Sequence, residues 1–256
     1  MDIILVVLFG LCIGSFLNVC IYRVPRQLSI ASPARSFCPK CNTQLTARDN
    51  VPVVSWLLLR GRCRNCGEKI SPQYPLVEAL TALAAVMTHH HFGFTITGFL
   101  IFTLVAALIV ISFIDLEFKI IPNVISFPGI TAGLLLGIVA QYTDWLHWPL
   151  TSSAWDSLLG MFVGGGFFFV IGWAYYFATK RVGLGGGDIK LMGMTGAILG
   201  VSSVAPTIFA GSLIGSVIGF AIILFKREGR HYEIPFGPWL SLGAVLYVFA
   251  DIGWFQ

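Results

Sequence analysis

Long apolar runs separated by short polar segments dominate the chain. The first run covers residues 2–22, and after a polar segment at 23–74 seven more follow, at 75–92, 96–114, 123–141, 157–178, 188–200, 203–225 and 234–252. Most runs are close to the roughly 20 residues that an α-helix needs to cross the hydrocarbon of a bilayer, and the run at 188–200 is short. The pattern predicts an all-α polytopic membrane protein with about eight transmembrane helices.

The composition agrees with a membrane protein. Hydrophobic residues make up 56% of the 256 residues and charged residues only 11%, and the mean hydropathy is +0.83. A soluble domain of average composition carries about 25% charged residues. This excludes a disordered chain and argues strongly against a soluble enzyme. The first run begins at Asp2, with no Lys or Arg before it, and Arg23 and Arg26 follow it directly, so it lacks the basic start of a cleavable signal peptide.

The basic residues predict how the helices are oriented. All sixteen Lys and Arg residues fall in four segments, 23–74, 115–122, 179–190 and 226–233. With the N-terminus outside, these four segments all face the cytoplasm, and the outside loops carry no Lys or Arg, as the positive-inside rule requires. We therefore expect both termini outside and the long polar segment in the cytoplasm.

Small residues are spaced for close contact between helices. Gly10 and Gly14 form one GxxxG pattern, Gly160 and Gly164 form another, and a third begins at Gly211. Glycines four residues apart lie on one helix face and let two backbones approach. We interpret these patterns as bundle packing.

Four of the six cysteines lie in the polar segment as two CxxC pairs, Cys38 with Cys41 and Cys63 with Cys66. Two such pairs separated by about 20 residues suit a tetrahedral thiolate site, with the intervening residues forming a short β-ribbon. A segment of about 50 residues is too small to be stable by core burial alone, and the reducing cytoplasm argues against disulfides. We interpret the four cysteines as a zinc site in a small cytoplasmic loop that is similar to a zinc ribbon. A redox-active CxxC pair and the absence of any site are the alternatives.

Two acids lie at membrane depth, where charge is costly and therefore points to function. Asp115 ends the third apolar run and Asp188 begins the sixth, and the predicted orientation puts both at cytoplasmic helix ends. Two facing carboxylates can share one proton, so that one acts as a general base on water and the other as an acid. The alternative is that each aspartate caps a helix end or pairs with Lys119 or Lys190.

Helix-breaking residues accompany both aspartates. Pro122 follows the first, and the glycines of GLGGGD, which include Gly185 and Gly187, precede the second. Irregular backbone there would let a substrate approach without side-chain obstruction, and Lys190 could moderate the charge of the pair. The glycine stretch fits neither a dinucleotide-binding loop nor a P-loop. Glu78, near the start of the second run, is either an interfacial acid or a functional one.

Taken together, these motifs resemble the bacterial type IV prepilin peptidases, which also process type II secretion pseudopilins. The resemblance rests on five strings in the same order: GSFLNVCIYRVP (14–25), NVPVVSWLLLRGRCRNC (50–66), ISPQYPLVEAL (70–80), DLEFKIIPN (115–123) and GGGDIKL (185–191). The last string fits the GxGD pattern of the family. No departure occurs at the two aspartates or the four cysteines.

The resemblance implies an integral aspartic endopeptidase of the bacterial inner membrane, with Asp115 and Asp188 catalytic and facing the cytoplasm. It implies cleavage of the basic leader of type IV prepilins or pseudopilins after a glycine. It also implies N-methylation of the new N-terminal residue, usually Phe, with S-adenosylmethionine, for which no binding residues are identified. The expected partners are these substrates and the lipid bilayer, and no nucleic acid.

On this basis we divide the chain into three parts. They are a first transmembrane helix at 1–22, a cytoplasmic tetracysteine zinc-binding loop at 23–74 associated with methyl transfer, and a seven-helix membrane domain at 75–256 with the peptidase site. Two other interpretations stay open. One is a GxGD intramembrane aspartic protease without methyltransferase activity, and the other is a non-enzymatic scaffold or transporter with a zinc ribbon.

Overall fold

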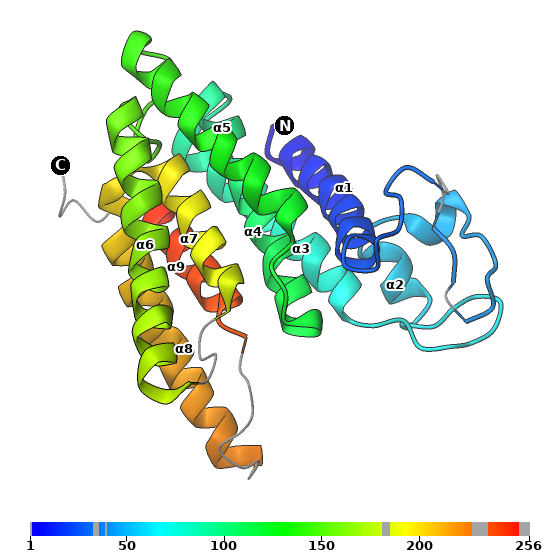
Figure 1. Cartoon of the computed structure of the whole chain (residues 1–256). Coiled ribbons are helices and arrows are strands. Elements are labelled where there is room, and N and C mark those ends of the chain that lie inside the picture. The colour runs from blue at the N-terminus through cyan, green and yellow to red at the C-terminus, as the bar shows by residue number, and fades with distance from the viewer. Residues whose placement is uncertain (1, 33–35, 39, 181–184, 227–234, 251–256) are drawn as a thin grey trace. The chain divides into compact units, whose positions relative to one another are not determined.

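The structure, a computed structural model, describes residues 2–32, 36–38, 40–180, 185–226 and 235–250 (Figure 1). Each predicted apolar run contains a helix. The helices are α1 (Asp2–Arg23), α3 (Gln73–Phe92), α4 (Ile96–Phe118), α5 (Asn123–Tyr142), α6 (Ala154–Thr179), α7 (Gly186–Leu199), α8 (Val204–Lys226) and α9 (Gly237–Phe249). The predicted all-α class is therefore confirmed. The basic residues Arg35, Arg181, Arg227 and Arg230, and Gly183 of the glycine stretch, lie outside the described residues.

Within the described part of the chain, five helices are long and apolar enough to cross a bilayer by themselves. They are α1, α4, α5, α6 and α8, so a multi-pass membrane protein is confirmed. The run predicted at 188–200 forms the 14-residue α7, whose side chains from Leu191 to Leu199 are all buried by neighbouring helices. A helix enclosed in this way is stabilised by protein contacts and does not need the length of a lipid-facing span.

The chain forms two compact units, residues 1–110 and 111–256. In the first unit, α1 and α3 lie side by side and antiparallel (Figure 1). A Cβ added at Gly10 or Gly14 would lie 2.6 Å from the Cα of Ala82 or Glu78, respectively. The first predicted GxxxG contact is thus confirmed. The antiparallel arrangement places the segment between the two helices at the end where α1 finishes and α3 begins.

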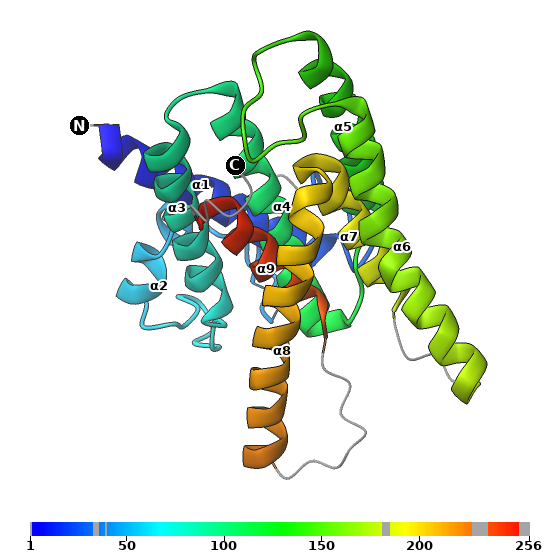
Figure 2. The same cartoon turned by 90° about the vertical axis from the view of Figure 1, so that its left-hand side faces the viewer.

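In the second unit, α6 lies beside α7, and α8 lies beside α9 (Figure 2). Glycines make both contacts close. Gly160 and Gly164 face the backbone of α7, where a Cβ would collide with carbonyl oxygens, and a Cβ at Gly211 would lie 2.8 Å from the carbonyl oxygen of Trp239 in α9. The other two GxxxG patterns are therefore helix contacts as well.

The segment between the two cysteine pairs differs from the prediction. In place of a β-ribbon, its described residues form a short 3-10 helix, η1 (Ala47–Asn50), and a one-turn helix, α2 (Val54–Leu58). Two isolated antiparallel bridges are present, Phe37 with Gln44 and Arg62 with Lys69. Each bridge closes around one CxxC pair, so the strand pairing is completed within each pair and does not run between them. The prediction of a β-ribbon between the two cysteine pairs was therefore wrong.

Candidate functional site

Asp115 lies inside the last turn of α4, because this helix continues to Phe118. Its side chain is buried, with 6% exposed. Oδ2 of Asp115 accepts a hydrogen bond of 3.0 Å from the backbone N–H of Gly237, the first residue of α9. Asp115 therefore caps a second helix, and the capping alternative holds for this residue without excluding a catalytic role.

The residues after Asp115 turn the chain sharply. Lys119 adopts a left-handed conformation with φ of 55°, and Pro122 precedes the first residue of α5 in an extended conformation. Between them, Ile121 is buried. A Cβ added at Gly187 or at Gly237 would lie 3.1 or 3.3 Å from the Ile121 side chain. The Ile121 side chain therefore packs against the backbone at two glycines. One is Gly187, which precedes Asp188, and the other is Gly237, which donates the hydrogen bond to Asp115.

Asp188 lies in the first turn of α7, which begins one residue after Gly185. An acid is favoured there by the helix dipole. The side chain is 9% exposed and interacts electrostatically with Asp115. The second unit therefore brings the two aspartates, from α4 and α7, into one buried site.

The other predicted site residues near Asp188 are Gly185, Gly187 and Lys190, and their surroundings differ. Gly185 and Gly186 are exposed, and a Cβ at Gly186 would meet no atom within 4 Å. Gly187, in contrast, faces Ile121 closely. The ammonium of Lys190 donates to the side-chain carbonyl of Asn123, the first residue of α5. Lys190 is therefore directed toward α5.

The four cysteines of the first unit converge as predicted. Their sulfur atoms all lie within 4.8 Å of one another, and the Sγ atoms of Cys38 and Cys66 are 3.9 Å apart. A tetrahedral zinc site with Zn–S bonds of about 2.3 Å places its sulfurs about 3.8 Å apart. Cys38 and Cys63 are buried. The donor set and its spacing fit a tetrahedral thiolate metal site.

Both CxxC pairs have the same local conformation. Cys38 and Cys63 each donate their backbone N–H to the carbonyl five residues later, at 3.0 and 2.8 Å. Each also accepts at 2.9 Å from the residue four positions later, which is Asn42 in the first pair and Gly67 in the second. Asn42 and Gly67 have φ values of 53° and 71°, a conformation that glycine and asparagine tolerate best. The repeated turn presents two sulfurs from each pair.

The thiols of this cluster differ in acidity. Hydrogen bonds from the hydroxyl and the backbone of Thr43 lower the pKa of the Cys41 thiol to about 6. The backbone N–H of Glu68 favours the Cys66 thiolate, but desolvation and the neighbouring thiols outweigh it and raise the pKa of Cys66 to about 12. Four thiolates this close together repel one another, so a bound cation is needed before all four can ionise. The closeness of the four thiols therefore favours a metal site.

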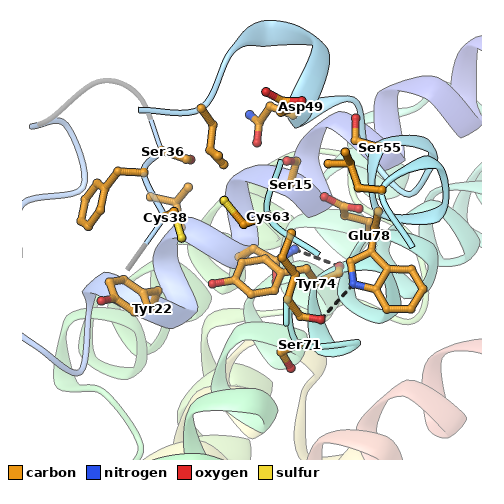
Figure 3. Close-up of a pocket in the computed structure, with 18 of the residues that line it drawn as sticks. Ser15, Tyr22, Ser36, Cys38, Asp49, Ser55, Cys63, Ser71, Tyr74 and Glu78 are labelled. Atoms are coloured by element: carbon orange, nitrogen blue, oxygen red, sulfur yellow. Dashed lines mark hydrogen bonds between the residues drawn. The ribbon is translucent and has the colours of Figure 1, made fainter. Parts of the chain in front are cut away.

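A cavity of about 350 Å³ lies between α1, α3 and the cysteine segment (Figure 3). Cys38 and Cys63 form part of its wall. Glu78 of α3 also lines it, is only 7% exposed, and accepts a hydrogen bond of 2.7 Å from the backbone N–H of Val53. The sequence did not distinguish Glu78 from an interfacial acid. The one signal for Glu78 in the sequence was its position in an otherwise apolar stretch, three residues before Thr81.

Comparisons with known proteins match most of the chain. Residues 8–92 match the family described as the bacterial peptidase A24 N-terminal domain, and residues 102–220 match the type IV leader peptidase family. The first match includes the four cysteines and Glu78, and the second includes both aspartates.

Individual relatives are similar over nearly their full length. A prepilin leader peptidase/N-methyltransferase of Aeromonas salmonicida (strain A449) is 36% identical, over 93% of this chain and 87% of the relative. Proteins with the same description from Neisseria gonorrhoeae and Bacillus subtilis (strain 168) are 35% and 34% identical, covering 98% and 95% of this chain and 91% and 93% of the relative. No solved structure matches the chain.

Proposed function

The chain belongs to the type IV leader peptidase family, and on this premise we propose that it is a bifunctional prepilin peptidase of the bacterial inner membrane. It removes the basic leader of type IV prepilins or pseudopilins by cleaving after a glycine. It then methylates the new N-terminal residue, usually Phe, with S-adenosylmethionine. The family and the relatives support both activities, and the five apolar helices agree with an integral membrane enzyme.

The observation that carries the peptidase proposal is the buried pair Asp115 and Asp188. In the proposed reaction one carboxylate is ionised and the other is protonated. The ionised carboxylate takes a proton from a water molecule while the water oxygen bonds to the scissile carbonyl carbon. The protonated carboxyl gives its proton to the amide nitrogen as the C–N bond breaks. Leader and mature protein then separate. The single proton of the pair now lies on the carboxyl group that began as the base, and it returns to the other carboxylate before the next cycle.

The hydrogen-bond partners favour different roles for the two residues. Asp115 accepts the N–H of Gly237 at the N-terminus of α9, and both this hydrogen bond and the helix dipole stabilise a negative charge. We therefore assign Asp115 as the ionised general base. Asp188 then carries the shared proton and acts as the general acid.

The position of the pair also supports cleavage at the membrane interface. Asp115 lies three residues from the end of α4, and Asp188 lies in the first turn of α7. The predicted orientation places these helix ends on the cytoplasmic side, where the leader of a prepilin meets its apolar helix. A protease that cuts within a substrate span would need its aspartates nearer the middle of the helices. The structure therefore supports the prepilin interpretation over the other GxGD protease.

We assign zinc to Cys38, Cys41, Cys63 and Cys66. Bound there, zinc would hold the two CxxC turns together and so fix the segment 23–74, which is too small for a core of its own. Its role is structural, because four protein sulfurs complete the tetrahedral coordination and leave no open position.

Methyl transfer follows cleavage, because only cleavage creates a free α-amine. S-adenosylmethionine supplies the methyl group: the amine nitrogen forms the N–CH3 bond as the S–CH3 bond breaks, a neutral thioether leaves, and the amine proton passes to solvent. We assign this activity to the tetracysteine segment, and cleavage to the membrane helices that carry the aspartates.

The direct test is incubation of the purified protein with a prepilin, with and without S-adenosylmethionine, followed by intact mass measurement. The proposal predicts loss of the leader in both reactions and the gain of one methyl group only when S-adenosylmethionine is present. A product cut inside the apolar helix would support an intramembrane protease instead. An intact substrate would favour the scaffold or transporter interpretation.

A further inference from the structure

We propose that the cavity of the first unit is the binding site for S-adenosylmethionine, with the carboxylate of Glu78 facing its sulfonium. This inference rests on the proposed methyltransferase activity and identifies where its methyl donor binds. The site lies at the ends of α1 and α3 and is closed by the tetracysteine segment (Figure 3).

The cavity suits a ligand of this size and chemistry. Its volume of about 350 Å³ falls in the range of small-molecule sites, about 300–1,000 Å³, which are mostly apolar with a few polar groups. Tyr22, Trp56 and Tyr74 contribute aromatic side chains to its lining. Aromatic rings stack on planar bases and attract cations to their faces. S-adenosylmethionine carries both an adenine and a sulfonium.

Among the acids that line the cavity, Glu78 differs from the other two. Two other acids of the lining have cationic partners: Asp49 pairs with Arg64 at 2.8 Å, and Glu68 pairs with Lys40 at 3.3 Å. Glu78 is more buried than either, yet within the described residues its donors are neutral. Burying a carboxylate without a counter-charge is costly. A ligand with a fixed positive charge would remove that cost.

A strained turn holds Glu78 in place. Val53 has φ of 60° and ψ of −50°, and the N–H of Val54 donates to the carbonyl of Pro52 at 2.6 Å. This is the rarer hand of γ-turn, which is strained and especially unfavourable for a β-branched residue. The Val53 N–H donates to Glu78, so the turn is tied to α3 at the cavity wall. Backbone strain of this kind is concentrated at ligand-binding sites, where it helps to hold the site in its binding conformation before the ligand arrives.

Further hydrogen bonds fix the aromatic side of the cavity. The side-chain amide of Asn18 in α1 donates to the carbonyl of Tyr74 at 3.0 Å, and the indole of Trp56 donates to the carbonyl of Ile70 at 3.1 Å (Figure 3). A wall that is already ordered costs less entropy when a ligand binds. Cys38 and Cys63 belong to the same wall. The proposed metal site and the proposed ligand site therefore share these two residues.

The test measures binding to the full-length protein in detergent by titration calorimetry, with S-adenosylmethionine and with its neutral product S-adenosylhomocysteine. Glu78→Gln keeps an acceptor for the Val53 N–H but removes the charge. We expect it to weaken S-adenosylmethionine binding about tenfold or more, the scale of losing a buried contact between opposite charges, and binding of the neutral product much less. Val19→Trp, which places an indole on a residue that lines the cavity, should abolish binding of both.

Two matched controls and one fold readout accompany these variants. Leu8→Trp puts the same indole on an exposed position of α1, and Asp144→Asn removes a carboxylate from an exposed loop of the second unit. Both should bind like the wild type. Prepilin cleavage without S-adenosylmethionine should persist in every variant, which shows that the protein is folded.

The outcomes separate the inference from the function on which it rests. Wild-type binding by Val19→Trp would overturn the cavity as the site. Equal loss of both ligands in Glu78→Gln would overturn the sulfonium contact. Failure of the wild type to bind or transfer would instead overturn the proposed methyltransferase activity, whatever the variants do.

Discussion

The carboxylate of Asp115 and the backbone of Gly237 are joined by a hydrogen bond of 3.0 Å. This contact connects the last turn of α4 to the first residue of α9 and fixes one of the two proposed catalytic groups. It also explains why residue 237 is a glycine, since a Cβ there would lie 2.7 Å from Oδ2 of Asp115.

Gly237→Ala should therefore impair cleavage. The added methyl group displaces the Asp115 carboxylate, and a displacement of about 1 Å at a reacting group can reduce the rate about 100-fold. Initial rates of prepilin cleavage measure the effect. Gly166→Ala is the matched control, because a Cβ at Gly166 in α6 meets no atom within 4 Å. Equal rates for the two variants would contradict the role given to this contact.

Asp115→Asn and Asp188→Asn should each abolish cleavage. Asparagine keeps the size and an acceptor oxygen but cannot exchange a proton with water or the leaving amine. Protein level, zinc content and methylation of a pre-cleaved substrate should persist in both variants, which sets them apart from misfolded protein. Cleavage at the wild-type rate by either variant would refute the pair and leave helix capping as the role of that aspartate.

One zinc ion should copurify with each chain. Cys63→Ser removes a buried ligand, so the metal should be lost and the segment 23–74 should become sensitive to protease. Elemental analysis and limited proteolysis measure these effects, and the exposed Cys12 in α1 supplies the control variant Cys12→Ser. Metal-free protein with reduced cysteines and a protease-resistant segment would argue decisively against the zinc site.

Removing the metal should affect the two activities differently. Cys38 and Cys63 line the proposed ligand cavity of the first unit, whereas both aspartates lie in the second unit. We expect a chelator to reduce S-adenosylmethionine binding and methyl transfer more strongly than cleavage. A parallel fall of both rates, in protein whose membrane helices stay folded by circular dichroism, would contradict this division.

The interaction of Asp49 with Thr46 and Arg64 has a defined dependence on pH. The Thr46 hydroxyl and the Arg64 guanidinium lower the pKa of Asp49. A lowered pKa means that the stabilisation is present above the ordinary value of about 3.9 and is lost as the pH falls through the lower folded value. Asp49→Asn should therefore increase amide exchange in η1 by a constant factor between about pH 8 and pH 5. A factor that shrinks within this range would contradict the lowered pKa.

The predicted orientation can be tested at the loop after α5. A cysteine introduced at Thr143, the residue that follows this helix, should react with an impermeant thiol reagent added from outside. The background variant lacks Cys12 and Cys20. Ser71→Cys, in the segment predicted to be cytoplasmic, should react only after the membrane is opened. The reverse pattern of labelling would refute the orientation.

The sequence by itself determined the helices and the chemistry of the two candidate sites. Hydropathy is a local property, so each apolar run of the chain became a helix, and only the ends shifted, as where α4 continues past Asp115. The CxxC pairs were recognisable for the same reason, since two ligands three residues apart share one turn. The composition of the chain was sufficient for the membrane class.

Only the tertiary structure decided which distant groups meet. The contact of Asp115 with Gly237 and the burial of Glu78 against Val53 join residues far apart in the chain, and no periodicity encodes such pairs. The same holds for α7, whose enclosure by other helices accounts for its short length, and for the helices that replaced the expected β-ribbon. Local patterns determine secondary structure, whereas side-chain packing between elements determines the surroundings of each charge and thus its function.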